Sequence, residues 1–139
     1  MNRAQLRTLA DERVRDARAL LKARRWSAAY DLVGSAIECA LKACVLAYVQ
    51  KTGIIFQDRK YAEKCWTHDI EVLLMAADLK VARDIDVGVN PDLGSNWIIV
   101  KDWSEISRYQ KKSESQAREL CAAVTDTANG VLPWIKTCR

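Results

Sequence analysis

The sequence predicts an all-α protein, an up-and-down bundle of four to five helices. Apolar residues recur at spacings of three and four along most of the chain, which is the period of a helix that buries one face. Helix-start signals stand between these stretches, with Asn90 before Pro91 and Ser113 three residues before Gln116. No stretch alternates apolar and polar residues with the period of two that a half-buried strand requires.

The central helix is expected at residues 26–51, the longest apolar pattern in the chain. Gly34 lies within this pattern, and its lack of a side chain predicts a close crossing with another helix. Residues 3–24 form the preceding helix. The short basic link from Ala23 to Arg25 predicts that the two helices are antiparallel neighbours, because so short a link leaves no room for another arrangement.

Shorter helical patterns follow, joined by polar or irregular connections. Thr67 is a favourable N-cap, because its hydroxyl can accept a hydrogen bond from a free N–H group of the first turn. The irregular connection at 52–66 is expected to pack against the bundle through its apolar residues Ile54, Ile55, Phe56, Tyr61 and Trp66. The expected order is a helix from Thr67, further helical turns at 79–87, a helix at 90–103, a polar connection at 104–112, a long helix from Ser113 to Asn129, and a terminal turn at Pro133.

The composition is that of one globular domain covering residues 1–139. Half of the residues are hydrophobic, 29% are charged, and the formal net charge is +4. Glu38 and Lys42 divide the longest apolar run, so no membrane span is expected. The N-terminus lacks the apolar core of a signal peptide, and the five cysteines, without a CxxC pair, are expected to be reduced. We therefore expect a cytoplasmic protein.

Few residues of the chain suit metal or cofactor binding. His68 is the only histidine, and one histidine without a cysteine pair excludes an ordinary zinc site. The five glycines are scattered, so the sequence has no glycine-rich phosphate loop, and no metal or cofactor is expected. The simplest interpretation of His68 is a residue at a helix start that is hydrogen-bonded to a neighbouring loop.

Two basic regions are candidates for contact with phosphate. Residues 1–60 hold 12 Lys or Arg against 6 Asp or Glu, which indicates either a solvated helix face or a surface that faces phosphates. The segment from Arg108 to Lys112 is either a solvated connection or an anion-binding segment, since it precedes a helix N-terminus. The five tryptophans are expected in core or interface packing, with base stacking as the alternative.

Four segments form a recognisable set. They are a basic first helix, the pattern A-x-E-x-x-L-K from Ala36 to Lys42, the segment T-H-D-I-E-V-L-L from Thr67, and the pair Arg108–Tyr109. Together they resemble the HEPN domain family of small helical proteins, over roughly residues 6–134. The resemblance implies a four- or five-helix up-and-down bundle that dimerises. Members of this family act as RNA-cleaving toxins or as partners of small nucleotidyltransferases, and other members bind nucleotides or RNA without activity.

The chain departs from the catalytic members of that family at one position. Those members use an Arg-x(4–6)-His motif, in which Arg and His from two subunits cleave RNA. Arg108 stands at the position of the arginine, but residues 113–115 are Ser, Glu and Ser, and His68 lies 40 residues earlier. Without that histidine no side chain near Arg108 has an ordinary pKa close to neutrality. RNA cleavage by the family mechanism is therefore not expected.

The leading hypothesis is a non-catalytic HEPN-type binding and interaction module that forms a homodimer and partners a nucleotidyltransferase in a toxin–antitoxin-like system. Its ligand, a nucleotide or RNA, would contact Glu38, Lys42, Arg108 and Tyr109. Arg108 would pair with Glu38 until a phosphate competes for it. Equally, these residues form a buried ion-pair cluster that only fixes the helix register.

Two further hypotheses belong to other functional classes. The first is a degenerate ribonuclease that uses His68 with Arg108, Glu38 or Asp102 in place of the family motif. The second is a scaffold or antitoxin-like protein that binds a partner through an apolar helix face.

Overall fold

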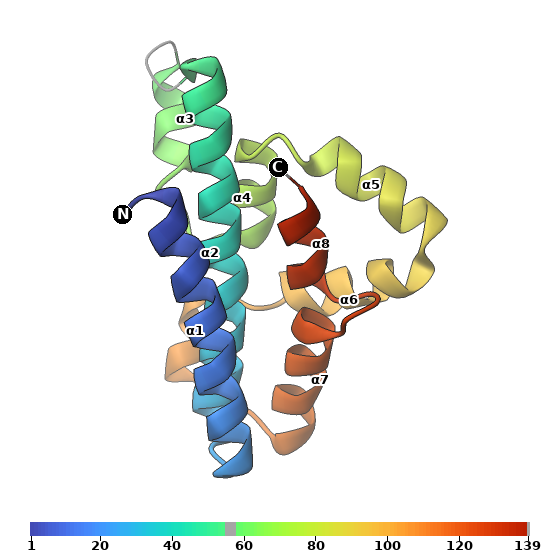
Figure 1. Ribbon diagram of the computed structural model, residues 1–139. Helices are drawn as coiled ribbons and strands as arrows, with labels where there is room; N and C mark the ends of the chain where they lie inside the picture. The colour runs from blue at the N-terminus through green and yellow to red at the C-terminus, as the bar shows by residue number, and fades with distance from the viewer. Residues whose placement is uncertain (55–57, 139) are drawn as a thin grey trace.

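The computed structural model describes residues 1–54 and 58–138, and this part of the chain is helical throughout, with no strand (Figure 1). The predicted all-α class is confirmed. The expected number of four to five helices is wrong, because the connections at 52–66 and 104–112 contain helices of their own and the turns expected at 79–87 and at Pro133 are helices. The elements are α1 (Arg3–Lys22), α2 (Trp26–Thr52), α3 (Arg59–Lys64), α4 (Ile70–Ala76), α5 (Lys80–Val89), α6 (Pro91–Lys101), the 3-10 helix η2 (Glu105–Tyr109), α7 (Glu114–Thr125) and α8 (Val131–Thr137).

The two long helices α1 and α2 form an antiparallel hairpin, as the short basic link predicted (Figure 1). The link closes α1 with a pair of backbone hydrogen bonds, from Arg24 N–H to the Leu21 carbonyl (3.1 Å) and from Arg25 N–H to the Leu20 carbonyl (2.8 Å). This is the Schellman arrangement, and it places Arg24 in the left-handed region with φ of 60°. Glycine is the usual residue at that position.

Helix α2 is the core of the molecule and contacts α1, α4, α7, α8 and η2. By length and composition α2 could cross a membrane, contrary to the expectation that Glu38 and Lys42 exclude this. The buried central helix of a globular protein has the same properties, and many α2 side chains are buried inside the bundle. Its buried residues are Ala29, Tyr30, Val33, Gly34, Ala36, Ile37, Cys39, Ala40, Leu41, Ala43 and Val45.

Gly34 allows a close approach to α2, but the group that approaches is an indole ring and not the helix that we predicted. A Cβ atom at position 34 would lie 2.2 Å from the Cδ1 and Nε1 atoms of Trp103. Trp103 itself is almost fully buried. Since Trp103 comes directly before η2, this contact fixes where η2 lies against α2.

The connection between α2 and α4 differs from its prediction in two respects. Trp66 is 84% exposed rather than packed against the bundle, and the N-cap of the next helix is Asp69, whose carboxylate accepts from Val72 N–H, rather than Thr67. Tyr61 does pack, and its hydroxyl donates to the Ala76 carbonyl. Ile55 and Phe56 lie outside the described residues.

Helix α5 lies at the edge of the molecule and has no buried residue (Figure 1). Val81, Ile85 and Val89, which follow one another at intervals of four residues, are exposed.

All five cysteines are free, and burial raises the pKa of the Cys121 thiol to about 11, which favours the neutral thiol.

Candidate functional site

A cluster of charged side chains is built on the middle of α2. The Lys42 ammonium lies 3.5 Å from the Glu38 carboxylate, which confirms the ion pair that the four-residue spacing predicts. The same Glu38 oxygen is hydrogen-bonded to Nδ1 of His68, which lies in the loop before α4. Glu38 is only 13% exposed, so both contacts lie partly out of water, where a charged hydrogen bond is stronger than at the surface.

Glu105 of η2 extends this cluster to Arg108. One Glu105 oxygen lies 3.4 Å from Nε2 of His68, and the other lies 3.6 Å from Nη2 of Arg108. We call the five residues Lys42, Glu38, His68, Glu105 and Arg108 the charge network. Arg108 therefore pairs with Glu105, and the expected pairing of Arg108 with Glu38 is wrong.

The position of His68 limits what it can do chemically. Both ring nitrogens face a carboxylate, and both can donate a hydrogen bond only when the imidazole is protonated. A general base needs a nitrogen lone pair directed at the substrate, and in this arrangement neither nitrogen is free. His68 is nevertheless half exposed, so the network is open to solvent on one side.

Two other candidate residues lie outside the charge network. Tyr109 follows Arg108 in η2, but its side chain is 82% exposed. Asp102 is the C-cap residue of α6 and makes no ion pair with a described residue. Sequence reasoning missed Glu105, although its spacing of three residues from Arg108 is a local signal for an ion pair.

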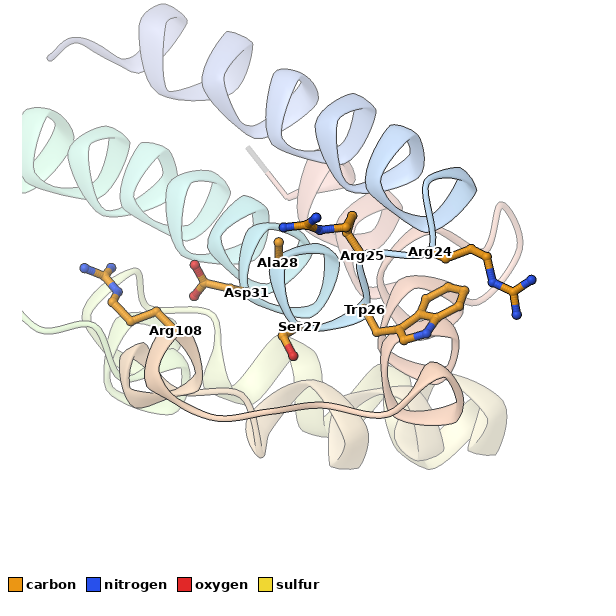
Figure 2. A pocket seen from close by; sticks show the side chains of 7 residues that line it. All are labelled: Arg24, Arg25, Trp26, Ser27, Ala28, Asp31 and Arg108. Atoms are coloured by element: carbon orange, nitrogen blue, oxygen red, sulfur yellow. The ribbon is translucent and has the colours of Figure 1, made fainter.

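A cavity of about 500 Å³ adjoins the network at Arg108. Its volume is within the range of small-ligand sites. Figure 2 shows Arg108 at one end of this cavity, Arg24 and Trp26 at the other, and Arg25 between the two ends. The residues that line it are Arg24, Arg25, Trp26, Ser27, Ala28, Asp31 and Arg108.

The lining of this cavity is positively charged. It contains three arginines and one acid, Asp31, and neither Arg24 nor Arg25 makes an ion pair with another described residue. Burial raises the pKa of the Asp31 carboxyl above its ordinary value; the negative charges of Glu38 and Glu105 add to this, while Arg108 and Arg13 oppose it.

Contacts with α7 and with the segment before it hold the first turn of α2 in place. The Ser27 hydroxyl accepts a hydrogen bond from Lys112 N–H at 2.9 Å. The guanidinium of Arg118 lies over the Trp26 ring at 5.2 Å, and that of Arg24 lies over the same ring at 6.0 Å. Cations over an indole ring are attracted by its negative face, so Trp26 helps to position two arginines.

The described part of the chain contains no group of three or more His, Cys, Asp or Glu side chains that could hold a metal ion. Searches against protein-family models, curated proteins and solved structures found no significant match to this chain.

Proposed function

We propose that this protein is a non-catalytic HEPN-type binding module whose ligand is a nucleotide or RNA, and that Arg108 contacts its phosphate. The observation that carries this proposal is the position of Arg108, where the charge network meets the arginine-lined cavity. Arg108 is about half exposed, and its ion pair with Glu105 is long at 3.6 Å. Such exposed pairs contribute little, so a phosphate can take the place of Glu105.

The remaining members of the network have supporting roles in this proposal. Glu38, which pairs with Lys42, is hydrogen-bonded to His68, and His68 in turn contacts Glu105, so these residues hold Glu105 of η2 against α2. Tyr109 offers an exposed ring beside Arg108 on which a base can stack.

The protein partners in this proposal, a second copy of the chain and a nucleotidyltransferase, are those that the resemblance to the HEPN family implies. Exposed Trp66 and the apolar stripe of α5 are the surfaces that such partners would cover.

The proposal is tested by titrating the protein with RNA and with a nucleotide, comparing wild type with Arg108→Ala. We expect Arg108→Ala to weaken binding by about tenfold, the loss typical of one charge-assisted contact. Arg59→Ala is the matched control, because Arg59 is 94% exposed in α3 and, among the described residues, pairs with Glu63 alone, at 3.8 Å. Equal binding by both variants would refute the role of Arg108. Light scattering of the free protein tests the homodimer.

A second candidate, a degenerate ribonuclease, is favoured by one observation. His68 and Arg108 contact the same carboxylate, so the two residues expected to act together are neighbours in the fold. A cleavage assay in EDTA, on structured and single-stranded RNA, decides between the candidates. Cleavage by wild type that both His68→Ala and Arg108→Ala abolish would establish the ribonuclease and overturn the binding module.

A further inference from the structure

We infer that the ligand is a single RNA strand whose successive phosphates lie along the arginines at the turn between α1 and α2. This inference rests on the proposed function, and it adds the residues and the class of ligand. We name Arg24, Arg25 and Arg108, with Arg118 beside Trp26, the arginine track. Its first three members line one cavity, and the fourth lies over the Trp26 ring.

The arrangement of the guanidinium groups favours a strand over a mononucleotide. In Figure 2 the three arginines of the cavity are spread from one end to the other and do not converge on a single point. One phosphate group could therefore not contact all of them at once. A strand presents a negative charge at every nucleotide, and guanidinium groups bind such phosphates through two parallel hydrogen bonds. Guanidinium groups that are spread in this way can each contact a different phosphate of one strand.

The choice of residues at the turn is a second observation. Arg24 occupies the left-handed position at the end of α1, where glycine is favoured, and Arg25 is the N-cap of α2 without a side-chain capping bond. Serine, threonine, aspartate or asparagine at position 25 would cap α2 and stabilise it. Two adjacent arginines thus stand where the backbone favours other residues, and such departures from local rules are expected at functional sites.

The charges around the two arginines complete the argument. Within the described chain neither Arg24 nor Arg25 has an acidic partner, and Asp31 is the single acid that lines the cavity. The pKa of the Asp31 carboxyl is influenced by the charges of Arg108 and Glu105 of η2, Glu38 of α2 and Arg13 of α1. Of the other two members of the track, Arg118 pairs with Glu114 at 2.9 Å and Arg108 with Glu105 at 3.6 Å. The unneutralised positive charge of the track is therefore that of Arg24 and Arg25, and it is available to phosphates.

The test uses two substitutions that the local backbone favours, so that loss of folding does not obscure the result. Arg24→Gly and Arg25→Ser are combined, and binding of an oligouridylate is measured at several salt concentrations. We expect a melting temperature no lower than that of wild type. Each phosphate contact on a single strand contributes about 0.7 to the slope of log affinity against log salt. The double variant should lose about 1.4 from this slope and, at 0.1 M salt, roughly 25-fold in affinity.

Asp78→Gly is the matched control, since Asp78 occupies the same left-handed position at the end of α4, with φ of 60°, away from the track. It should leave both slope and affinity unchanged. The inference is overturned if the double variant binds oligouridylate as wild type does, or if polyglutamate competes as well as RNA at equal charge. If Arg108→Ala alone weakens binding, the proposed function stands without the track. If neither oligouridylate nor a nucleotide binds, both the arginine track and the proposed function are refuted.

Discussion

The charge network and the arginine track share Arg108 but differ in whether their basic side chains pair with carboxylates. In the network each basic side chain contacts a carboxylate: Glu38 contacts Lys42 and His68, and Glu105 contacts His68 and Arg108. In the track, Arg108 and Arg118 pair with Glu105 and Glu114, whereas Arg24 and Arg25 make no ion pair with a described residue. Paired charges hold elements of the protein together, whereas unpaired charges are free to hold a ligand. Substitutions in the network should therefore change stability, and substitutions in the track should change binding.

The largest effect is expected from a residue that supports both regions. Gly34→Ala places a Cβ atom 2.2 Å from the buried Trp103 ring, which must move and displace η2 with it. We expect the free energy of unfolding to fall by about 3 kcal/mol, the upper part of the range for overpacking a core, and RNA binding to weaken because Arg108 shifts. Chemical denaturation measures the first effect and titration the second.

Gly88→Ala is the control for this prediction. Gly88 lies in α5, and apart from its own helix backbone no atom of the described residues would lie within 4 Å of a Cβ at that position. Alanine there should raise the free energy of unfolding by up to about 1 kcal/mol, because it favours the helix. A Gly34→Ala protein as stable as wild type would show that Trp103 does not position η2.

Glu38→Gln tests whether the charge network contributes to stability without contributing to RNA binding. The substitution removes the carboxylate that Lys42 and His68 share, and Glu38 is largely buried, so we expect a loss of about 2 kcal/mol in the free energy of unfolding. Affinity for oligouridylate should stay within about twofold of wild type. Glu63→Gln is the matched control, with a loss below about 0.5 kcal/mol, because its pair with Arg59 is exposed. A loss of binding without a loss of stability would place Glu38 in the ligand site.

Asp31 gives the track a dependence on pH whose sign follows from its raised pKa. As the pH falls from about 7 toward the ordinary Asp pKa of 3.8, Asp31 takes up a proton and its negative charge leaves the cavity. Phosphodiesters keep their charge over this range, so affinity for oligouridylate should rise, by about fivefold if one charge is gained. Asp31→Asn should bind with that higher affinity already at pH 7 and lose this part of the dependence.

The raised pKa of Asp31 also makes the stability of the protein depend on pH. Because the pKa of Asp31 is higher in the folded state than in the unfolded state, the folded protein binds the proton more tightly. The resulting stabilisation is fully present below the unfolded-state pKa and is lost as the pH rises through the folded-state pKa. Melting curves of wild type and Asp31→Asn against pH measure this contribution. Parallel curves would mean that Asp31 is as solvated in the fold as in the unfolded chain.

Local signals made part of this molecule predictable. The capping box of Ser113 and Gln116 and the cap at Asn90 form as the sequence indicates, because each depends on residues a few positions apart. The number of helices was not predictable in the same way. Helices as short as α3 and η2 are unstable alone and form through tertiary contacts, which a local pattern does not contain.

The candidate site likewise combines contacts that local sequence predicts with contacts that depend on the fold. The pair of Glu38 and Lys42 is local and follows from their spacing of four residues along one helix, whereas the contact between Glu38 and His68 joins residues 30 positions apart and depends on the fold. The segment that contains Glu105 was predicted to be a polar connection, and no role was predicted for its carboxylate. The basic link at Arg24 and Arg25 was visible in the sequence, but only the fold brings it to the same cavity as Arg108.

The smallest expected effect compares Arg24 and Asp78, the two residues other than glycine that lie in the left-handed region of the described chain. Arg24 and Asp78 end α1 and α4 with the same φ of 60° and the same pair of backbone hydrogen bonds. Glycine relieves the steric cost of this conformation in the folded state but adds entropy to the unfolded state, so each substitution should change the free energy of unfolding by less than about 1 kcal/mol. Aspartate tolerates the left-handed region better than arginine does, because its short side chain hydrogen-bonds locally. Arg24→Gly should therefore stabilise the protein more than Asp78→Gly, as measured by chemical denaturation. The opposite order would mean that the Arg24 side chain, through its contact with Trp26, contributes to folding as well as to binding.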